Sequence, residues 1–573
     1  MRNIKFQYFS NTNKKENIGL ISGPLFFIII LFFPFPHDIT SNNTNPDSEN
    51  MYFPFPPRIA LGTMVWMVIW WISECVPLGF TSLLAPFIFI FSGILTANQA
   101  LSKFSDPIIW IFISGFVLAA AFKKCGLDKR IAYRLATFYK GNNPRIAIFF
   151  IACLPVFLLS MTGSITTSTT IVFPFVLAFM NILNIPVDSS QINKNNVNNL
   201  TNINNITTKP RNSGPKKEKV KKNTYAEAGF LSLGQAATAG AMLLLISTAP
   251  NLIAKATVED FVPGKTISFT DWFVIGLPHA IIGLLISWNI IFLILRPKVN
   301  LLSSVRDQFK NSLNKMGKIT MEEKIVLIVL LMALILWTVP SLLRSFYPPD
   351  INTSINDKVE KTDISFILLN NFTKNVPESI PALLIILAIG LIRIKRNNNK
   401  EEEELNTNSV TISPILNWNE ILKSIDWNII FLFGGGLVLG IGIENSGLAS
   451  LMGNLISYNL GANTTEWSIF AISAMMGFIM SYAASNTASA VIMCPIAASL
   501  AIGAGFDPIP PIIAAGLAAS ISSAIPSTTP PMAIIYSSNA VSIWNMFKTG
   551  IISDLLRLGI LITLGPLLIG LVF

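Results

Sequence analysis

The chain has 573 residues, of which 51% are hydrophobic and only 13% are charged. This composition excludes an ordinary soluble domain and is typical of a protein that crosses a membrane several times. The two histidines, His37 and His279, and the four cysteines without a CxxC pair offer no pattern for histidine-based catalysis, a zinc site or a disulfide framework. The net charge of +10 does not indicate a nucleic-acid partner, because the basic residues lie in loops between apolar segments.

Residues 1–18 are polar and basic and are predicted to form a cytoplasmic arm. The apolar spans that follow are long enough, or nearly so, to cross a hydrocarbon core of about 30 Å. With the N-terminus inside, the strong basic clusters fall on the inner face and the C-terminus lies outside. We expect an all-α polytopic protein of the plasma membrane. Its eleven predicted spans are 19–36, 58–74, 78–96, 107–124, 226–256, 270–296, 324–341, 377–393, 427–445, 509–540 and 550–573.

Two further stretches, residues 145–183 and 465–503, each carry a polar tip in the middle of an apolar run. Each is long enough for two helical legs, so we expect two re-entrant hairpins that enter and leave on one side. Backbone that is not helical at this depth is tolerated only inside protein or beside water. The tips are Ser164-Ile165-Thr166 and Ser485-Asn486-Thr487.

The two tips are copies of each other, separated by a constant shift of 321 residues (485 − 164). The same shift reaches upstream and downstream, which indicates an internal duplication. The first hairpin is predicted to open inward and the second outward, an inverted repeat typical of secondary transporters with a site near the midplane. The predicted domains are N-terminal scaffold helices (19–105), a first repeat (106–296), connecting helices and loops (297–426) and a second repeat (427–573).

An insert rich in Asn and then Lys, residues 187–225, is predicted to be a disordered cytoplasmic segment. Beyond it the shift falls to 281 (529 − 248), and each repeat contains a second polar interruption. These interruptions contain proline, which removes a backbone donor and frees a carbonyl. They are ISTAPN (246–251) and STTPP (527–531), inside broken helices predicted at 226–256 and 509–540.

The tips and breaks together predict two cation sites that flank one anion site. Hydroxyls and free carbonyls are oxygen ligands suited to a small cation, and the half-helix after each break presents a partial positive end to an anion. Neither tip contains Arg or Lys. A bound anion would therefore be neutralised by co-bound cations, which makes its binding cation-dependent. One break alone is explained by helix packing, but four breaks in two related pairs favour a binding site.

Five segments carry a resemblance to a known family: WWISECVPLGFTSLL (70–84), FTDWFVIGLP (269–278), FLFGGGLVLG (431–440), the ASNTAS tip (484–489) and the TTPP break (528–531). In combination they resemble the divalent anion/sodium symporters, which are di- and tricarboxylate carriers. The resemblance runs from about Gly19 to the C-terminus, apart from the 187–225 insert. It implies a homodimer, scaffold and transport domains, elevator-type alternating access, and sodium-driven uptake of succinate-, malate- or citrate-like anions, or of sulfate.

Carried over position by position, the resemblance implies one anion site and two sodium sites, with sodium as the coupling ion. The anion would meet Thr166, Thr248, Asn486, Thr487, Thr529 and Pro530. The second sodium site would use Ser481, Ala484, Asn486 and Thr528, partly through carbonyls. The first sodium site would use Ser160, Ser164 and Ser247.

The sequence departs from the family pattern at Ile165, where the first tip usually carries Asn. An Ile side chain can neither ligate a cation nor hydrogen-bond a carboxylate. Two outcomes are open: the first sodium site is weakened or lost, or a carbonyl or water fills the gap. A smaller departure is Met532, where the family usually has Asn.

The predicted function is sodium-coupled secondary transport of a divalent or trivalent anion across a lipid bilayer. An anion exchanger with reduced sodium coupling is the alternative that Ile165 raises, and a sulfate transporter fits the same neutral hydroxyls. A passive anion channel is a further alternative, distinguished by a lack of counterflow. An enzyme is not expected, because the sequence lacks an HExxH motif, a Ser/Cys–His pair and clustered intramembrane carboxylates.

Overall fold

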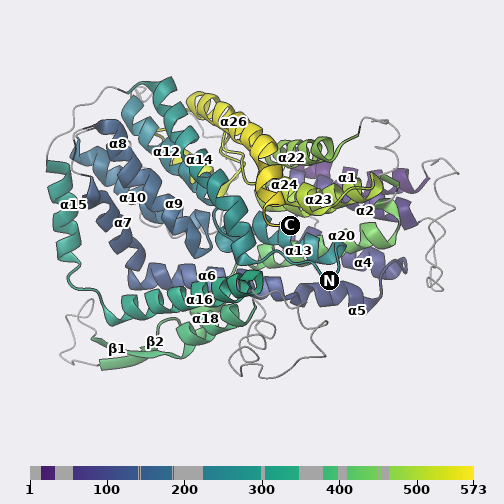
Figure 1. The fold of residues 1–573 in the computed structure, drawn as a ribbon, viewed down its shortest axis with the longest axis horizontal. Coiled ribbons are helices and arrows are strands. Elements are labelled where there is room, and N and C mark those ends of the chain that lie inside the picture. Colours follow the sequence, from purple (N-terminus) through teal and green to yellow (C-terminus); the bar gives the residue numbers. More distant parts are fainter. Residues whose placement is uncertain are drawn as a thin grey trace, which may run out of the picture.

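The computed structural model is built almost wholly of helices (Figure 1). It describes residues 14–32, 56–139, 141, 143–183, 185, 223–297, 304–346, 379–397, 410–449, 451–452 and 464–573. Within these residues, eight helices are long and apolar enough to cross a membrane. The all-α polytopic class predicted from the sequence is therefore confirmed, whereas the total of eleven spans and the orientation of the termini stay predictions.

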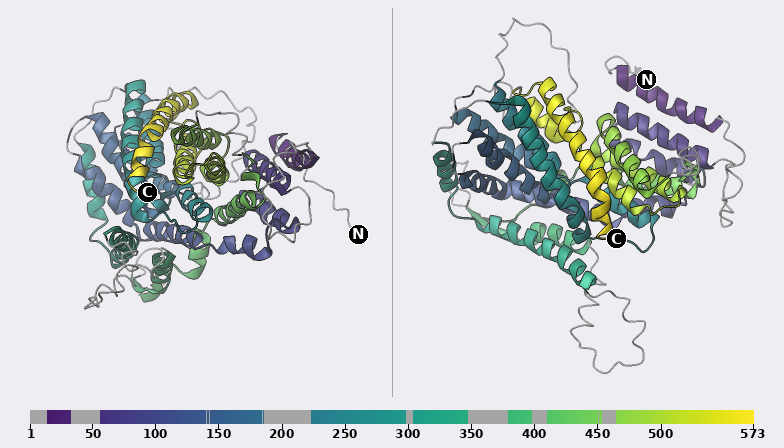
Figure 2. Two further views of the ribbon diagram at one scale, coloured as in Figure 1. Left: turned by 45° about the vertical axis from the view of Figure 1, so that its right-hand side comes forward. Right: turned by 45° about the horizontal axis from the view of Figure 1, so that its top comes forward.

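The N-terminal helices form one end of the molecule (Figure 2). Helix α1 packs along α2, where a Cβ atom added to Gly62 would lie 2.8 Å from the Phe27 ring. Because α1 begins at Lys14, the last residues of the predicted arm belong to the first helix, and residues 1–13 lie outside the described part. The elements are α1 (Lys14–Phe32), α2 (Pro56–Ser73), α3 (Leu78–Thr81), α4 (Leu84–Phe91), α5 (Ala97–Ser102) and the 3-10 turn η3 (Lys103–Ser105).

The segment predicted as the first hairpin consists of two helical legs that meet at the tip. The first leg contains a π-helical turn and ends in a 3-10 turn, and Gly163, with φ of 98°, starts the reversal. The elements of this half are α6 (Pro107–Cys125), α7 (Leu127–Phe138), α8 (Pro144–Ile148), η4 (Phe149–Cys153), α9 (Leu154–Leu159), η5 (Ser160–Thr162), α10 (Ile165–Ile182), α12 (Thr224–Gly240), η7 (Leu245–Ser247), α13 (Ala249–Phe261) and α14 (Phe269–Leu295).

The middle of the chain connects the two halves through helices and one small sheet. Strands β1 and β2 pair antiparallel, with Arg393 opposite Pro414. The elements are α15 (Ser304–Lys315), α16 (Met321–Phe346), α18 (Ser379–Leu391), β1 (Arg393–Asn397), β2 (Val410–Pro414) and α19 (Trp418–Ser424).

The second half repeats the order of helix, hairpin legs, broken helix and long helix. Its elements are α20 (Trp427–Asn445), α22 (Glu466–Ala483), α23 (Asn486–Gly503), α24 (Ile509–Ala518), α25 (Pro530–Ser537) and α26 (Ile543–Gly570). The segment 241–248 separates α12 from α13, and the segment 519–529 separates α24 from α25.

Several predicted boundaries differ by a few residues from the helix ends in the structure, among them the starts of α12 and α26. Helix α12 begins at Thr224, so the last two residues of the predicted insert 187–225 are helical, while residues 186–222 lie outside the described part. Helix α26 begins at Ile543 instead of at residue 550. The reason is a polar cap: Ser542 Oγ accepts a hydrogen bond from Asn545 N, and Ser542 N donates to the Glu227 carboxylate at 2.7 Å.

The two halves interlock through their broken helices. Helix α13 packs on α23 and α24, and α25 packs on α10 and α12, so each half-helix after a break contacts the other half. Glycines make the close approach possible: a Cβ atom on Gly516 would lie 2.7 Å from Ala254 Cβ, and one on Gly234 would lie 2.8 Å from Met532 Sδ. This packing places the breaks of both halves in the middle of one helical body.

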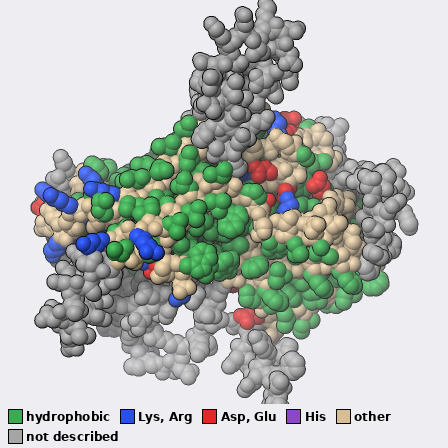
Figure 3. Space-filling view, turned by 90° about the horizontal axis from the view of Figure 1, so that it is seen from below, with side chains coloured by type: hydrophobic (Ala, Val, Ile, Leu, Met, Phe, Trp, Pro, Cys, Tyr) green, Lys and Arg blue, Asp and Glu red, His purple; other side chains and the backbone are tan. Residues whose placement is uncertain are grey.

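Hydrophobic side chains cover much of the face drawn in Figure 3. Large apolar residues point outward from the long helices, with Ile335 56%, Ile479 67% and Leu567 67% exposed. Such a surface is costly in water and suits the hydrocarbon core of a bilayer. The chain is thus a multi-pass membrane protein.

Candidate anion and cation site

Both hairpin tips have the same local geometry, in which a serine caps the helix that leaves the tip. Ser164 Oγ accepts a hydrogen bond from Thr167 N at 3.1 Å, and Ser485 Oγ accepts one from Ala488 N at 3.3 Å. In each tip, the carbonyl of this serine also accepts a hydrogen bond from the hydroxyl of the serine four residues later, Ser168 or Ser489. Because the cap satisfies one N–H group, the other first-turn N–H groups keep the partial positive charge of a helix start.

The two helix breaks also share one geometry. Thr248 and Thr529 are extended, with φ/ψ of −155°/156° and −143°/148°, and neither side chain caps the helix that follows. At the second break, Pro530 and Pro531 have no N–H to offer, so the Thr529 hydroxyl is a principal donor at the start of α25. Both helix starts therefore present donors and a partial positive end to a ligand.

In the first half, the tip lies directly against the break. The turn η5 contacts the turn η7, and a Cβ atom added to Gly240 would lie 2.8 Å from Ser160 Oγ. Asn251 stabilises the break, because its Nδ2 donates hydrogen bonds to the carbonyls of Ala241 and Leu244 at 2.7 and 2.8 Å. Two residues predicted for the first sodium site, Ser160 and Ser247, therefore lie on segments that touch.

In the second half, Ser522 of the break joins the tip residues. Its hydroxyl lies 3.1 Å from Asn486 Oδ1 and 3.4 Å from the Ser481 carbonyl oxygen. Ser481 and Asn486 were both predicted for the second sodium site, and the structure brings them together around one hydroxyl. Two of the four cation ligands predicted in this half thus belong to a single cluster of oxygens.

Two donors, one at the second tip and one at the second break, have no hydrogen-bond partner among the described residues: Asn486 Nδ2 and Thr529 Oγ1. Their residues are only 7% and 3% exposed. A buried donor without a partner costs about 1–3 kcal/mol, so such groups in a native protein are normally paired. Because both residues were predicted to contact the anion, their unpaired donors fit an anionic ligand.

The remaining predicted residues lie at the same helix starts. Thr528 is buried and its hydroxyl donates to the Ile525 carbonyl at 2.8 Å, while Ala484 is buried at the second tip. Within the described residues, hydrogen bonds do not join the first tip to the second; the hydrogen bonds between the halves lie elsewhere, as between Ser542 and Glu227. Thr166, Thr248 and Thr487 are half-buried, and Pro530 is exposed.

Ile165 occupies the position of Asn486 in the first tip. It is 8% exposed but does not belong to the continuous hydrophobic core. Its carbonyl accepts a hydrogen bond from Thr169 Oγ1 at 2.8 Å. The predicted first cation site therefore lacks a side-chain oxygen where the predicted second site has Asn486 Oδ1.

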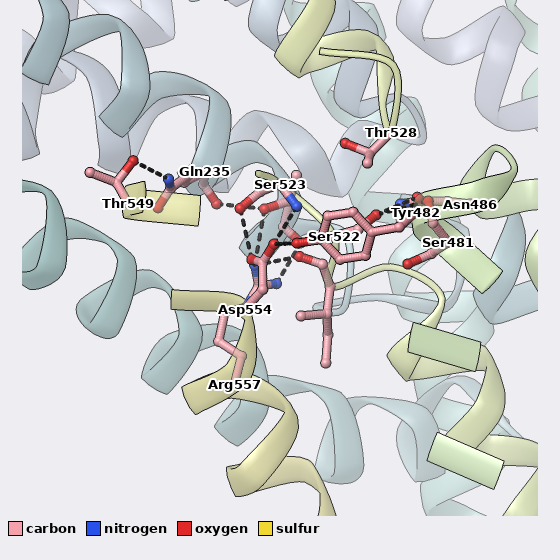
Figure 4. Close-up of polar contacts among 12 residues, drawn as sticks. Gln235, Ser481, Tyr482, Asn486, Ser522, Ser523, Thr528, Thr549, Asp554 and Arg557 are labelled. Carbon is pink, nitrogen blue, oxygen red and sulfur yellow. Dashed lines mark hydrogen bonds and ion pairs between the residues drawn. The ribbon is translucent and has the colours of Figure 1, made fainter. Parts of the chain in front are cut away.

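Sequence reasoning missed a buried polar cluster beside the second break (Figure 4). Asp554 and Arg557 are 0% and 4% exposed, although they lie within the long apolar helix α26. Ionisable residues inside a membrane helix mark a functional site by default. The signal was present in the sequence as an Asp and an Arg three residues apart in the last apolar span, and assessing that span by hydrophobicity alone overlooked it.

The side chains around the tips suit an alkali cation. Within the part of the chain that the structure describes, His, Cys, Asp and Glu form no group of three that could hold a metal ion. A cation at the tips would be held by neutral hydroxyl, amide and carbonyl oxygens. Such ligands favour a hard ion over a soft transition metal.

Gly163 of the first tip provides a test of this geometry. It combines a φ of 98° with a position where a Cβ atom would lie 2.8 Å from Gly115 Cα. Gly163→Ala is expected to destabilise the protein by about 2–5 kcal/mol, the sum of left-handed strain and overpacking, and to reduce uptake. The matched control is Gly264→Ala, which has a φ of 84° but nothing within 4 Å. Equal melting temperatures for the two variants would contradict the close contact between tip and α6.

Polar hairpin tips that meet helix breaks inside a bundle of apolar helices are the main polar features of this membrane protein. The family model described as "Sodium:sulfate symporter transmembrane region" matches residues 14–572. The chain belongs to this family, which confirms the resemblance to sodium-coupled anion carriers.

Curated relatives match nearly the whole chain. It is 27% identical over 571 residues to the sodium-dependent dicarboxylate transporter SdcS of Staphylococcus saprophyticus, covering 98% of this chain and 94% of that protein. It is 27% identical over 575 residues to SdcS of Staphylococcus aureus strain MRSA252, covering 98% and 95%. A solved structure of Neisseria gonorrhoeae MtrF, from work on a class of antimetabolite efflux pumps, aligns with a TM-score of 0.46 and 13% identity over 90% of this chain and 95% of that chain.

Proposed function

We propose that this protein is a sodium-coupled secondary transporter of di- and tricarboxylates such as succinate, malate or citrate. The observation that carries the proposal is the orientation of the Asn486 side chain. Its Oδ1 accepts a hydrogen bond from the Ser522 hydroxyl, which also lies 3.4 Å from the Ser481 carbonyl oxygen, while its Nδ2 has no partner among the described residues. The near-full-length similarity to transporters named sodium-dependent dicarboxylate transporters supports it further.

In this proposal Asn486 couples the two substrates. The amide oxygen contacts sodium, and the amide N–H contacts a carboxylate of the anion, so the cation fixes the group that binds the anion. The cation also neutralises part of the anion's charge, which is necessary because a dianion at this depth is costly without compensation. Binding of either substrate therefore strengthens binding of the other.

The anion lies between the two halves, against the starts of four helices. Thr166, Thr248, Asn486, Thr487, Thr529 and Pro530 bind it. Sodium at the second site meets Ser481, Ala484, Asn486 and Thr528, and the first site is formed by Ser160, Ser164 and Ser247. Because Ile165 supplies no amide to the first site, we propose that coupling uses fewer sodium ions than the symmetrical arrangement allows. Anion exchange with reduced sodium coupling is the second candidate function, favoured by the same residue.

Transport proceeds by an elevator movement of the hairpins and broken helices against α6 and α20, within a homodimer in the plasma membrane. Supporting contacts lie where these parts meet. A Cβ atom on Gly436 would lie 2.3 Å from Val491 Cγ1, and one on Gly163 would lie 2.8 Å from Gly115 Cα. Glycines allow helix backbones to approach closely and leave few side chains to obstruct sliding. The N-terminus is cytoplasmic and the C-terminus is outside in this arrangement.

The proposal is tested by transport in proteoliposomes. Labelled succinate should accumulate under an inward sodium gradient, fail to accumulate with choline, and show counterflow when unlabelled succinate is loaded inside. Competition by malate, citrate and sulfate then ranks the anions. Sodium-independent flux without counterflow would contradict coupled transport and indicate a channel.

A further inference from the structure

We propose that Ser522 is a direct ligand of the second cation site, and that Asp554 and Arg557 are positioning residues that hold it there. This inference rests on the proposed function, since it completes the cation site of that transporter. It adds a residue that the family resemblance did not supply and gives a role to the buried charged pair.

The argument for Ser522 is the set of oxygens around it. Asn486 Oδ1 and the Ser481 carbonyl oxygen are both acceptors, and both lie within 3.4 Å of Ser522 Oγ. A hydroxyl has one hydrogen, so it can satisfy only one of them well. Three oxygens from three separate segments therefore converge on one point, where a small cation would satisfy all of them. Ser522 is fully buried there.

The position of Ser522 is fixed from one side by Asp554. Asp554 accepts hydrogen bonds from Ser523 N at 2.6 Å, from Ser523 Oγ at 2.7 Å and from the Tyr482 hydroxyl at 2.6 Å (Figure 4). Ser523 follows Ser522, and Tyr482 follows Ser481. One carboxylate thus holds the neighbours of two of the three converging oxygens.

Arg557 fixes the other side. Its Nη1 donates to the Ile521 carbonyl at 3.1 Å, so the residues before and after Ser522 are both held by α26. The guanidinium also donates to the hydroxyl and carbonyl of Thr238 in α12, at 3.1 and 3.2 Å. The second break is thereby connected to the helix that leads into the first break.

The burial of the Asp554–Arg557 ion pair is a further argument that the pair positions the break loop. Asp554 Oδ1 and Arg557 Nη1 are 3.7 Å apart and almost completely buried. Burying two charges carries a large desolvation cost, and replacing a buried ion pair by apolar residues is often neutral or stabilising. Stability alone therefore does not account for the pair, whereas a rigid break loop at a cation site does.

The first experiment compares Ser522→Ala with Ser520→Ala in purified protein. Ser520 lies in the same break and is also 0% exposed, but its hydroxyl makes no hydrogen bond to Asn486 or Ser481, so it controls for the loss of a buried hydroxyl from the break. Thermal stabilisation is measured as sodium replaces choline at constant ionic strength. Ser522→Ala should need about tenfold more sodium for half-maximal stabilisation and should show altered lithium-to-sodium selectivity, whereas Ser520→Ala should match the wild type.

The second experiment tests the positioning role with Ser523→Ala and Asp554→Asn. Ser523→Ala removes one contact of Asp554 without leaving a charge unpaired, so it remains informative if Asp554→Asn does not fold. Both should raise the sodium concentration for half-maximal uptake several-fold, while the maximal rate at saturating sodium stays near the wild-type value. A merely structural role would lower the melting temperature and leave the sodium requirement unchanged.

A wild-type sodium requirement and ion selectivity in Ser522→Ala would overturn the ligand assignment. A wild-type sodium requirement in Ser523→Ala would overturn the positioning role. If the wild-type protein responds to sodium and Ser522→Ala responds equally, the inference alone fails. If the wild-type protein neither transports succinate nor gains stability with sodium, the proposed function fails as well.

Discussion

Asn486→Ala is expected to reduce sodium-dependent dicarboxylate uptake by about 100-fold or more. The amide contacts both substrates in the proposed site, and each hydrogen bond or ion contact to a charged group contributes about 1.5–3 kcal/mol. Loss of two such contacts corresponds to about 3–6 kcal/mol, or more than two decades in kcat/KM. Initial rates of succinate uptake at varied sodium concentration measure the effect.

The matched control for Asn486 is Ser499→Ala on the same helix. Ser499 is fully buried and donates to the Pro495 carbonyl at 2.8 Å, away from the tip. It should leave the apparent affinities for sodium and succinate unchanged. A fall in succinate affinity with wild-type sodium affinity in Asn486→Ala would show that the residue binds the anion alone and would refute the coupling role.

Ile165→Asn is expected to add a sodium ion to the transport cycle. With two sodium ions and a dianion the inward step is electroneutral, and with three it carries one positive charge. The additional ion contributes about 1.4 kcal/mol at a tenfold gradient, and the additional charge contributes about 2.3 kcal/mol at −100 mV. The sum of about 3.7 kcal/mol corresponds to a roughly 500-fold greater limiting accumulation of succinate.

The Ile165 prediction is measured by the Hill coefficient for sodium and by succinate-evoked current. Ile165→Asn should raise the Hill coefficient and produce an inward current, whereas Ile165→Val, which keeps the apolar character, should do neither. An unchanged Hill coefficient and no new current in Ile165→Asn would mean that the first site is already complete through a carbonyl or water.

Much of the local geometry of the candidate site could be predicted from the sequence, because its tip residues recur at one shift and its break residues at another. The tip serines, Asn486 and the break threonines stand out as polar groups in apolar runs, and they lie at helix starts with matching geometry. Local chemistry was sufficient at these positions, because capping serines and prolines determine where a helix begins.

Ser522, Asp554 and Arg557 could not be assigned in the same way. Their roles depend on contacts between α22, the second break and α26, which are separated by more than 30 residues along the chain. A hydrophobic pattern shows that α26 is apolar but not which neighbour its two charged residues meet. The early start of α26 has a similar cause, because its cap depends on Glu227 in the other half.

The most direct measurement of the central claim is the affinity of the purified wild-type protein for succinate, by calorimetry, in saturating sodium and in choline of equal ionic strength. The account predicts that sodium strengthens succinate binding by about 5–150-fold, the usual range of coupling between linked sites, and that succinate strengthens sodium binding by the same factor. Equal succinate affinity in sodium and in choline would contradict it.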